Sequence, residues 1–235
     1  ARYTALPSGS ELRPTCHASL STMITELTGV PAGTAAIRLT LRDQVFELPV
    51  QPNHGADFAG RRVLFTMSRD NDLAWIAEWA RWHVALHGTD AIVFFDNGST
   101  RYGLADIEAT LLGVDGIGKV AVQSWPHTYG MTDDALSVNP FYILFLQVSS
   151  MSVALRRYAA SAHGLLNCDI DELVRTPPGT TIFDLCRRSR QGLVVMRGRY
   201  IEPVADPGAP EAGRTHRHYS HHHADRRQAA SRPKK

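Results

Sequence analysis

The segment Asp169-Ile170-Asp171-Glu172 carries two carboxylates that could bind a cation together. In an extended chain, residues i and i+2 point to the same side, so Asp169 and Asp171 share one face. Hard cations such as Mn²⁺ or Mg²⁺ prefer oxygen ligands and complete their shell with water or substrate phosphates. The pair therefore suits a metal held jointly by protein and diphosphate. A solvated acidic turn is the common alternative, but the apolar residues 164–166 indicate a strand end here and favour the metal site.

Two more polar clusters follow apolar runs, Ser68-Arg69-Asp70-Asn71 after residues 63–67 and Asp96-Asn97-Gly98-Ser99 after residues 91–95. Ligands of parallel α/β sheets bind at the carboxyl ends of the strands. The cluster at Asp96 offers acceptors for a base or a ribose, although on its own it is more typical of a tight turn that ends in a helix cap. Arg156 and Arg157 could bind a diphosphate in bidentate fashion, or could form a solvated helix end.

The elements that must position these clusters alternate along the chain from Arg62. Buried strands are expected at residues 63–67, 91–95, 120–122, 165–168 and 193–196. Helices are expected at 73–87, 105–112, 140–160 and 182–188, with Asn71 or Asp72 capping the first and Gly88 ending it. This order predicts right-handed βαβ units in an α/β fold with a mostly parallel sheet. Trp75, Trp79 and Trp82 share one helical face, which is more often core than a platform for sugars.

Three parts are expected: a lead-in and hairpin (1–60), a ligand-binding α/β domain (61–203) and a tail (204–235). Residues 1–34 are rich in Pro, Gly, Ser and Thr and are expected to be loosely ordered. Residues 37–50 alternate as a β-hairpin with one buried face, and residues 51–60 are a linker. The tail is rich in His and Arg and is expected to be disordered. Its histidines, from His216 to His223, could supply a metal ligand, although such clusters usually bind metals adventitiously.

Composition excludes several classes of function. The chain of 235 residues carries a net charge of +2, but the tail holds seven basic residues against three acidic ones. The rest is therefore slightly acidic, which speaks against a nucleic-acid partner. Three cysteines without a CxxC pair exclude a disulfide scaffold, and no apolar run is long enough for an integral membrane segment, so we expect a cytoplasmic protein. Dinucleotide and P-loop fingerprints are absent, and the glycine-rich residues 113–118 fall at the opposite edge of the sheet.

The order of four segments resembles GT-A glycosyltransferases of the family 2-like and family 92-like groups. They are TMSRDNDLAWIAEW (66–79), HGTD (87–90), FDNGST (95–100) and LNCDIDEL (166–173). The resemblance covers residues 62–203 and implies a nucleotide-sugar donor, usually UDP-linked, and a divalent metal, Mn²⁺ or Mg²⁺. Asn71-Asp72 stands where the family usually has Asn-Glu, so donor contacts there can differ.

The expected site combines the resemblance with the strand-end positions. On the resemblance, Asp169 and Asp171 bind the metal and diphosphate, and Asp96 contacts the nucleoside. The other nucleotide-binding candidates are Thr66, Ser68, Arg69, Asn71, Asn97, Ser99 and Arg156. Glu202 is the first candidate for a general base because it follows the expected fifth strand, and Asp206 is the second. A retaining enzyme would need no such base.

The sequence thus predicts metal-assisted transfer of a sugar from a nucleotide-sugar donor to a glycan, lipid or small-molecule acceptor. The first alternative is a nucleotide- or sugar-binding module of the same fold without transfer activity. The second is an adaptor whose basic tail binds anionic polymers, which a steep salt dependence of binding would reveal.

Overall fold

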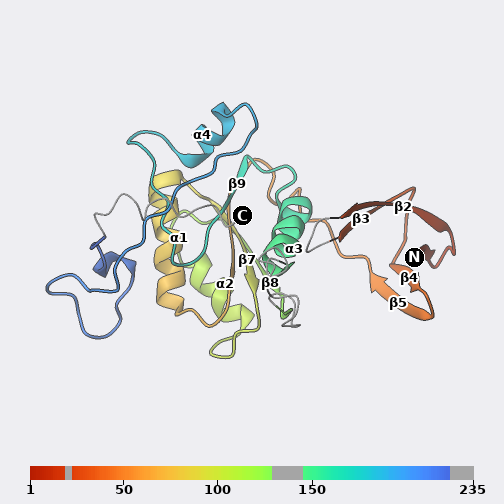
Figure 1. Ribbon diagram of the computed structural model, residues 1–235, viewed down its shortest axis with the longest axis horizontal. Helices are drawn as coiled ribbons and strands as arrows, with labels where there is room; N and C mark the ends of the chain where they lie inside the picture. The colour runs from red at the N-terminus through yellow and green to blue at the C-terminus, as the bar shows by residue number, and fades with distance from the viewer. Residues whose placement is uncertain (19–22, 129–144, 223–235) are drawn as a thin grey trace.

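The computed structural model describes residues 1–18, 23–128 and 145–222, which form one antiparallel and one parallel sheet (Figure 1). The strands are β1 (Arg2–Leu6), β2 (Glu11–Ala18), β3 (Met23–Thr28), β4 (Ala36–Leu41), β5 (Gln44–Pro49), β6 (Arg62–Ser68), β7 (Ala91–Asp96), β8 (Lys119–Ser124) and β9 (Gly164–Asn167). The helices are α1 (Leu73–His87), α2 (Leu104–Leu112), α3 (Phe145–Val153), the π-helix η2 (Ala154–Tyr158), α4 (Ile182–Arg188) and the 3₁₀ helix η3 (His216–His218).

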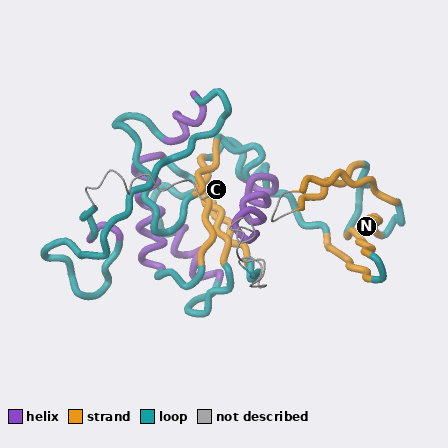
Figure 2. Tube along the Cα trace, in the orientation of Figure 1, coloured by secondary structure: helices purple, strands orange, loops and turns teal. Residues whose placement is uncertain are grey.

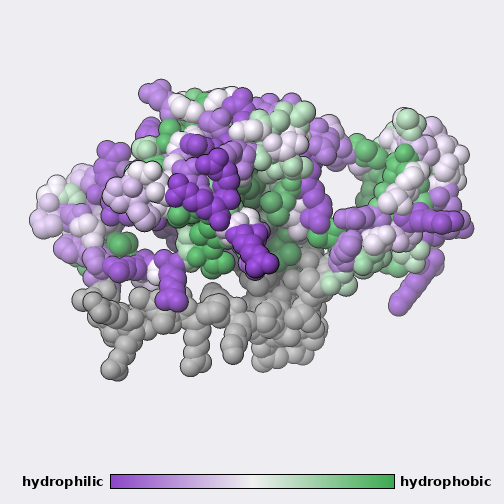
Figure 3. All heavy atoms as spheres, turned by 90° about the horizontal axis from the view of Figure 1, so that it is seen from above, coloured by the Kyte–Doolittle hydropathy of each residue, from purple (hydrophilic) through white to green (hydrophobic). Residues whose placement is uncertain are grey.

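The antiparallel sheet has the order β3-β2-β1-β4-β5 and forms a lobe at one end of the molecule (Figure 3). The expected hairpin at 37–50 is confirmed as β4 and β5, which pair from Leu41 with Gln44 to Ala36 with Pro49. The buried face expected for this hairpin is found only in part, because β4 is half-buried, through Ile37 and Leu39, and β5 is exposed along its whole length. The core of this lobe is small and consists of Tyr3, Ala5 and Leu12 with partly buried neighbours.

The expectation of a loosely ordered lead-in over residues 1–34 is wrong, because β1, β2 and β3 lie within it. These strands are stabilised mainly by hydrogen bonds to neighbouring strands, and less by the burial of their own apolar side chains. Strand β2 buries only Leu12 and contains Pro14, so its sequence gives little strand signal.

The parallel sheet has the order β8-β7-β6-β9, and each neighbouring pair is parallel, which confirms the α/β class. The chain forms β6, β7 and β8 in succession and then crosses to the other side of β6 as β9. Helices α1 and α2 cover one face of the sheet, and α3 with η2 covers the other (Figure 2). The strand order therefore reverses between β6 and β9, where open α/β sheets bind ligands at their carboxyl edge.

Alternate residues of the central strands supply two separate cores. Leu64 and Phe94 pack with α1 and α2, whereas Val63, Phe65 and Phe95 pack with η2 on the other face. Strands buried on both faces read as continuous apolar runs, which is why the sequence predicted β6 and β7.

Helix α1 has the predicted ends. Asp72 is its N-cap residue, without a side-chain capping bond, and Gly88 ends it with a φ of 62°, a left-handed conformation that glycine adopts without strain. Trp79 is fully buried, and the Trp82 indole donates to the Val174 carbonyl at 2.8 Å. These two side chains are therefore part of the structure's interior contacts and are not a sugar platform.

Two other expected elements differ from the structure. The fifth strand at 193–196 is absent, because this apolar run pairs with no described strand, and Val195 is 85% exposed. Of the helix expected at 140–160, residues 140–144 lie outside the described residues, Phe145–Val153 is α-helical, and Ala154–Tyr158 forms the π-helix η2. Within the described residues, no helix is long and apolar enough to cross a membrane.

Candidate functional site

The carboxyl ends of β6 and β7 lie side by side at one edge of the parallel sheet. Ser68 pairs with Asp96 in the strand register, and the Asn97 amide donates to the Ser68 carbonyl at 2.9 Å. The structure thus brings together the two polar clusters that the sequence singled out. Thr66 lies farther inside, fully buried, and its hydroxyl has no hydrogen-bond partner among the described residues.

The Asp96 carboxylate is 95% buried and shapes the loop that follows β7. It accepts hydrogen bonds from the Ser99 hydroxyl at 2.5 Å, the Ser99 amide at 3.0 Å and the Gly98 amide at 3.2 Å. A carboxylate has about four lone-pair positions, so one of them remains for a ligand. The tight-turn interpretation of this cluster is therefore realised in the structure.

Asp70 connects the loop after β6 with the loop after β7. Its amide donates to the Ser99 hydroxyl at 2.9 Å, and its carboxylate accepts from the amides of Thr100 at 2.7 Å and Arg101 at 3.2 Å. These backbone hydrogen bonds, with that of Thr100 the strongest, lower the pKa of Asp70. The residue adopts a φ of 55°, a left-handed conformation that the surrounding bonds hold in place.

The other candidate residues after β6 differ in which of their polar groups remain available to a ligand. The Asn71 amide group donates to the Ser68 hydroxyl at 2.8 Å, so this hydroxyl can still donate its own proton. The Arg69 side chain is 62% exposed and lies 3.7 Å from an Asp70 oxygen. Arg69 is therefore an accessible cation of the loop after β6, and Arg101 of the loop after β7, 56% exposed and paired with Asp72, is another.

Asn97 extends the same network to β8. Its side-chain amide donates to the carbonyls of Trp125 at 2.8 Å and His127 at 2.9 Å, and the Trp125 amide donates to the Asp96 carbonyl. Asn97 is thus a structural link between strand ends, and its side-chain donors are already used.

The acidic segment begins two residues after Asn167, the last residue of β9, which pairs with Phe65 of β6. No hydrogen bond between described residues joins it to the loops after β6 and β7. The extended geometry expected for this segment is not found, because residues 169–172 form a turn in which Asp169, Asp171 and Glu172 are all exposed and only Ile170 is buried. The Asp169 amide donates to the Glu172 carboxylate at 3.0 Å, and the Glu172 amide donates to the Asp169 carbonyl at 3.0 Å. The two acids therefore belong to a closed turn, which we call the acidic turn (residues 169–172).

Among the described residues, no lysine or arginine forms an ion pair with the acidic turn. Partial burial, and then the carboxylates of Glu172 and Asp171, raise the pKa of Asp169. A divalent cation would relieve this repulsion, and two carboxylates match an ion that completes its shell with phosphate and water. In the described part of the chain, no three His, Cys, Asp or Glu side chains lie close enough together to hold a metal ion. A cation at the acidic turn would therefore need further ligands from phosphate or water.

Two buried histidines of α1, which the sequence reading did not single out, hold the chain that leads away from the acidic turn. His83 donates through Nδ1 to the Trp79 carbonyl, and its Nε2 lies 3.6 Å from the Cys168 sulfur and accepts from the Val174 amide. His87 donates through Nε2 to the Val174 carbonyl at 3.1 Å. Their i, i+4 spacing within an apolar helix face was the only available signal.

Burial fixes the protonation states of this contact. It lowers the pKa of His83 to about 4 and raises the pKa of the Cys168 thiol to about 12. The imidazole is therefore neutral and the thiol protonated near pH 7. Cys168 is a structural residue here and not a nucleophile.

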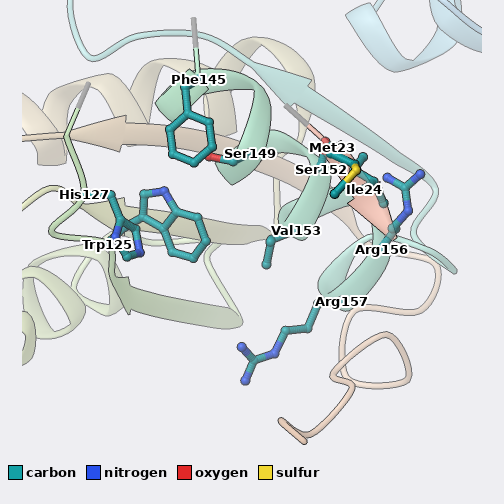
Figure 4. A pocket seen from close by; sticks show the side chains of 10 residues that line it. All are labelled: Met23, Ile24, Trp125, His127, Phe145, Ser149, Ser152, Val153, Arg156 and Arg157. Atoms are coloured by element: carbon teal, nitrogen blue, oxygen red, sulfur yellow. The ribbon is translucent and has the colours of Figure 1, made fainter. Parts of the chain in front are cut away.

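Arg156 lies away from the hydrogen-bonded loops, on η2. It lines a pocket of about 590 Å³ between the end of β8, the face of α3 and the start of β3 (Figure 4). Other lining residues are Met23, Ile24, Trp125, His127, Phe145, Ser149, Ser152, Val153 and Arg157. Trp125 and His127 lie at one end of this pocket and Arg156 at the other, and no hydrogen bond between described residues joins Arg156 to the acidic turn or to the loops after β6 and β7.

The two general-base candidates lie in a segment that pairs with the later part of the tail. The Glu202 amide donates to the His221 carbonyl at 2.7 Å, and the expected strand that was to bring Glu202 to the sheet edge is absent. The Asp206 carboxylate accepts from the Ser220 hydroxyl at 2.7 Å, which lowers its pKa and makes it a weaker base.

Comparisons of this chain with protein-family models, with curated proteins and with solved structures find no match.

Proposed function

We propose that this protein binds a nucleotide-sugar across the carboxyl edge of its parallel sheet and transfers the sugar with the help of a divalent metal. One observation carries the proposal. The acidic turn begins two residues after the carboxyl end of β9, the strand that pairs with β6 where the strand order reverses. Two exposed carboxylates that follow a parallel strand suit a cation bound together with a diphosphate.

Each residue's proposed role follows from the polar groups that it does not use in hydrogen bonds within the protein. Asp169 and Asp171 would hold the cation, and the exposed Arg69 would bind the phosphates. The Ser68 hydroxyl can donate to a ribose or phosphate oxygen. Asp96 offers one remaining lone pair to a base and shapes the loop around it. A bound divalent ion would supply neutralisation of the charge that builds on the departing diphosphate.

A non-catalytic nucleotide-binding module is the second candidate, favoured by a specific observation. The carboxylate of Asp206 is engaged by Ser220 and His221, and Glu202 has lost the strand that was expected to position it. An inverting transferase needs a base at the acceptor, whereas a binding module or a retaining enzyme does not.

A thermal-shift screen of UDP, UDP-sugars and other nucleotide-sugars, with Mn²⁺ or with EDTA, tests the proposal. Ligands that bind only the folded state raise the unfolding temperature, and the rise grows with the logarithm of the ratio of ligand concentration to Kd. We expect a shift for a nucleotide-sugar with Mn²⁺ and a smaller one with EDTA. No shift with any nucleotide would contradict the proposal, and metal-dependent binding without donor hydrolysis or transfer would favour the binding module.

A further inference from the structure

A short stretch of the tail lies against both α1 and the acidic turn. We call residues 215–219 the C-terminal strap. His216 in the strap is 91% buried, and its Nε2 atom lies 2.7 Å from the carbonyl oxygen of Ile170, the residue between the two turn aspartates. Its ring also packs edge-on against Trp75 of α1 at 4.4 Å between centroids. Figure 1 shows η3 beside α1, on the side away from the sheet.

The chemistry of this contact fixes the tautomer. A carbonyl oxygen can only accept, so Nε2 of His216 must carry the hydrogen and donate it. The other ring nitrogen faces the Glu78 carboxylate of α1 at 3.9 Å. Arg217, the next residue of the strap, donates to the same carboxylate. The strap is therefore fixed to α1 by a charged pair and to the acidic turn by one hydrogen bond.

The bond to Ile170 acts on the backbone that carries both carboxylates. The Ile170 side chain is 97% buried in the core, and the Glu172 amide closes the turn on the Asp169 carbonyl. The His216 bond supplies the remaining constraint, at the peptide between residues 170 and 171. Without it, this peptide could rotate, and the Asp171 carboxylate would move relative to that of Asp169.

We propose that His216 is a positioning residue, which ties the C-terminal strap to the acidic turn and holds the two aspartates in one arrangement. Its consequence for cation binding rests on the proposed function. Its consequence for the turn itself does not, because the hydrogen bond exists without any ligand.

Amide hydrogen exchange at Glu172 tests the positioning role in the ligand-free protein. His216→Phe keeps the ring and removes the donor, whereas His216→Gln keeps a donor amide at a similar distance from the backbone. We expect exchange to become about two- to tenfold faster in His216→Phe, the range given by one hydrogen bond, with partial recovery in His216→Gln. His221→Ala, an exposed histidine of the same tail, is the matched control and should leave exchange unchanged. Equal exchange in wild type and His216→Phe would overturn the proposal.

The wild-type protein gives an independent test that requires no substitution. Long-range ¹H–¹⁵N correlation spectra distinguish the two neutral tautomers of a histidine. We expect His216 with its hydrogen on Nε2, and a His216 with its hydrogen on Nδ1 alone would overturn the proposed bond to Ile170.

Mn²⁺-dependent UDP binding separates this inference from the proposed function. If the wild type binds, His216→Phe should weaken metal-dependent affinity by about the same factor as it accelerates exchange, and His17→Ala, at an exposed histidine of β2, should not. Unchanged affinity in a folded His216→Phe would overturn the positioning role. If the wild type does not bind UDP with Mn²⁺, the proposed function fails, and the exchange and tautomer results still decide whether His216 holds the turn.

Discussion

Ser99 joins two loops of the candidate site through a single hydroxyl group. This hydroxyl donates to the Asp96 carboxylate and accepts from the Asp70 amide. The residue that the sequence marked as a nucleotide contact is thus a structural residue of the site, and its loss should first affect stability.

We expect Ser99→Ala to lower the free energy of unfolding by about 1.5–3 kcal/mol, because a hydrogen bond to a charged group is lost and the Asp70 amide loses its acceptor. Urea denaturation measures the difference. Ser161→Ala is the matched control, since its exposed hydroxyl has no described hydrogen bond. Equal losses in the two variants would show that the Ser99 network contributes nothing specific.

His83 should make the protein less stable in acid. Its pKa is about 4 in the folded state and about 6.5 in the unfolded chain, so the unfolded chain binds the extra proton between these values. Stability is fully present above pH 6.5 and falls as the pH drops towards 4, with a loss of about 2 kcal/mol at pH 5. Urea denaturation at pH 7 and pH 5 tests this. A His83→Asn variant should be less stable at pH 7 but lose less on acidification, and an unchanged pH dependence would contradict the assignment.

At the scale of elements, the C-terminal strap adds stability to α1. Trp75 and Glu78 of α1 contact His216 and Arg217, and Glu78 is almost fully buried. Removing one partner of such a pair leaves the other charge without compensation.

We therefore expect a chain that ends at residue 214 to unfold about 4–8 °C below one that ends at residue 222, which corresponds to about 2 kcal/mol for a protein of this size. The longer truncation retains each of these contacts and is the matched control. Differential scanning calorimetry makes the comparison, and coincident transitions of the two truncated proteins would show that the strap does not stabilise α1.

The sequence predicted those elements whose own residues determine them. Strand β7 is buried on both faces and reads as a continuous apolar run, and Gly88 ends α1 because its backbone needs a positive φ. Strands β1 to β3 could not be predicted, because backbone hydrogen bonds to neighbouring strands stabilise them and their own sequences carry little apolar alternation. The run at 193–196 has the composition of a strand, but no described strand pairs with it.

At the scale of the whole molecule, the candidate site could be predicted only in part. Parallel strands place their carboxyl ends at one edge, so the proximity of Ser68 and Asp96 followed from the fold class. The position of Arg156 on η2, and the contact of His216 with the acidic turn, depend on how distant segments pack. Such contacts between distant segments leave no periodic pattern in the sequence, so they could not be predicted from it.

The central claim concerns the acidic turn and is tested by calorimetric titration with UDP in Mn²⁺ and in EDTA. We expect wild type to bind UDP with Mn²⁺ and at least about tenfold more weakly with EDTA, as the loss of one charged contact implies. Asp171→Asn should bind like wild type in EDTA even when Mn²⁺ is present, whereas Glu172→Gln, which keeps an acceptor for the Asp169 amide, should retain the metal dependence. Equal affinity of wild type for UDP in Mn²⁺ and in EDTA would contradict the claim.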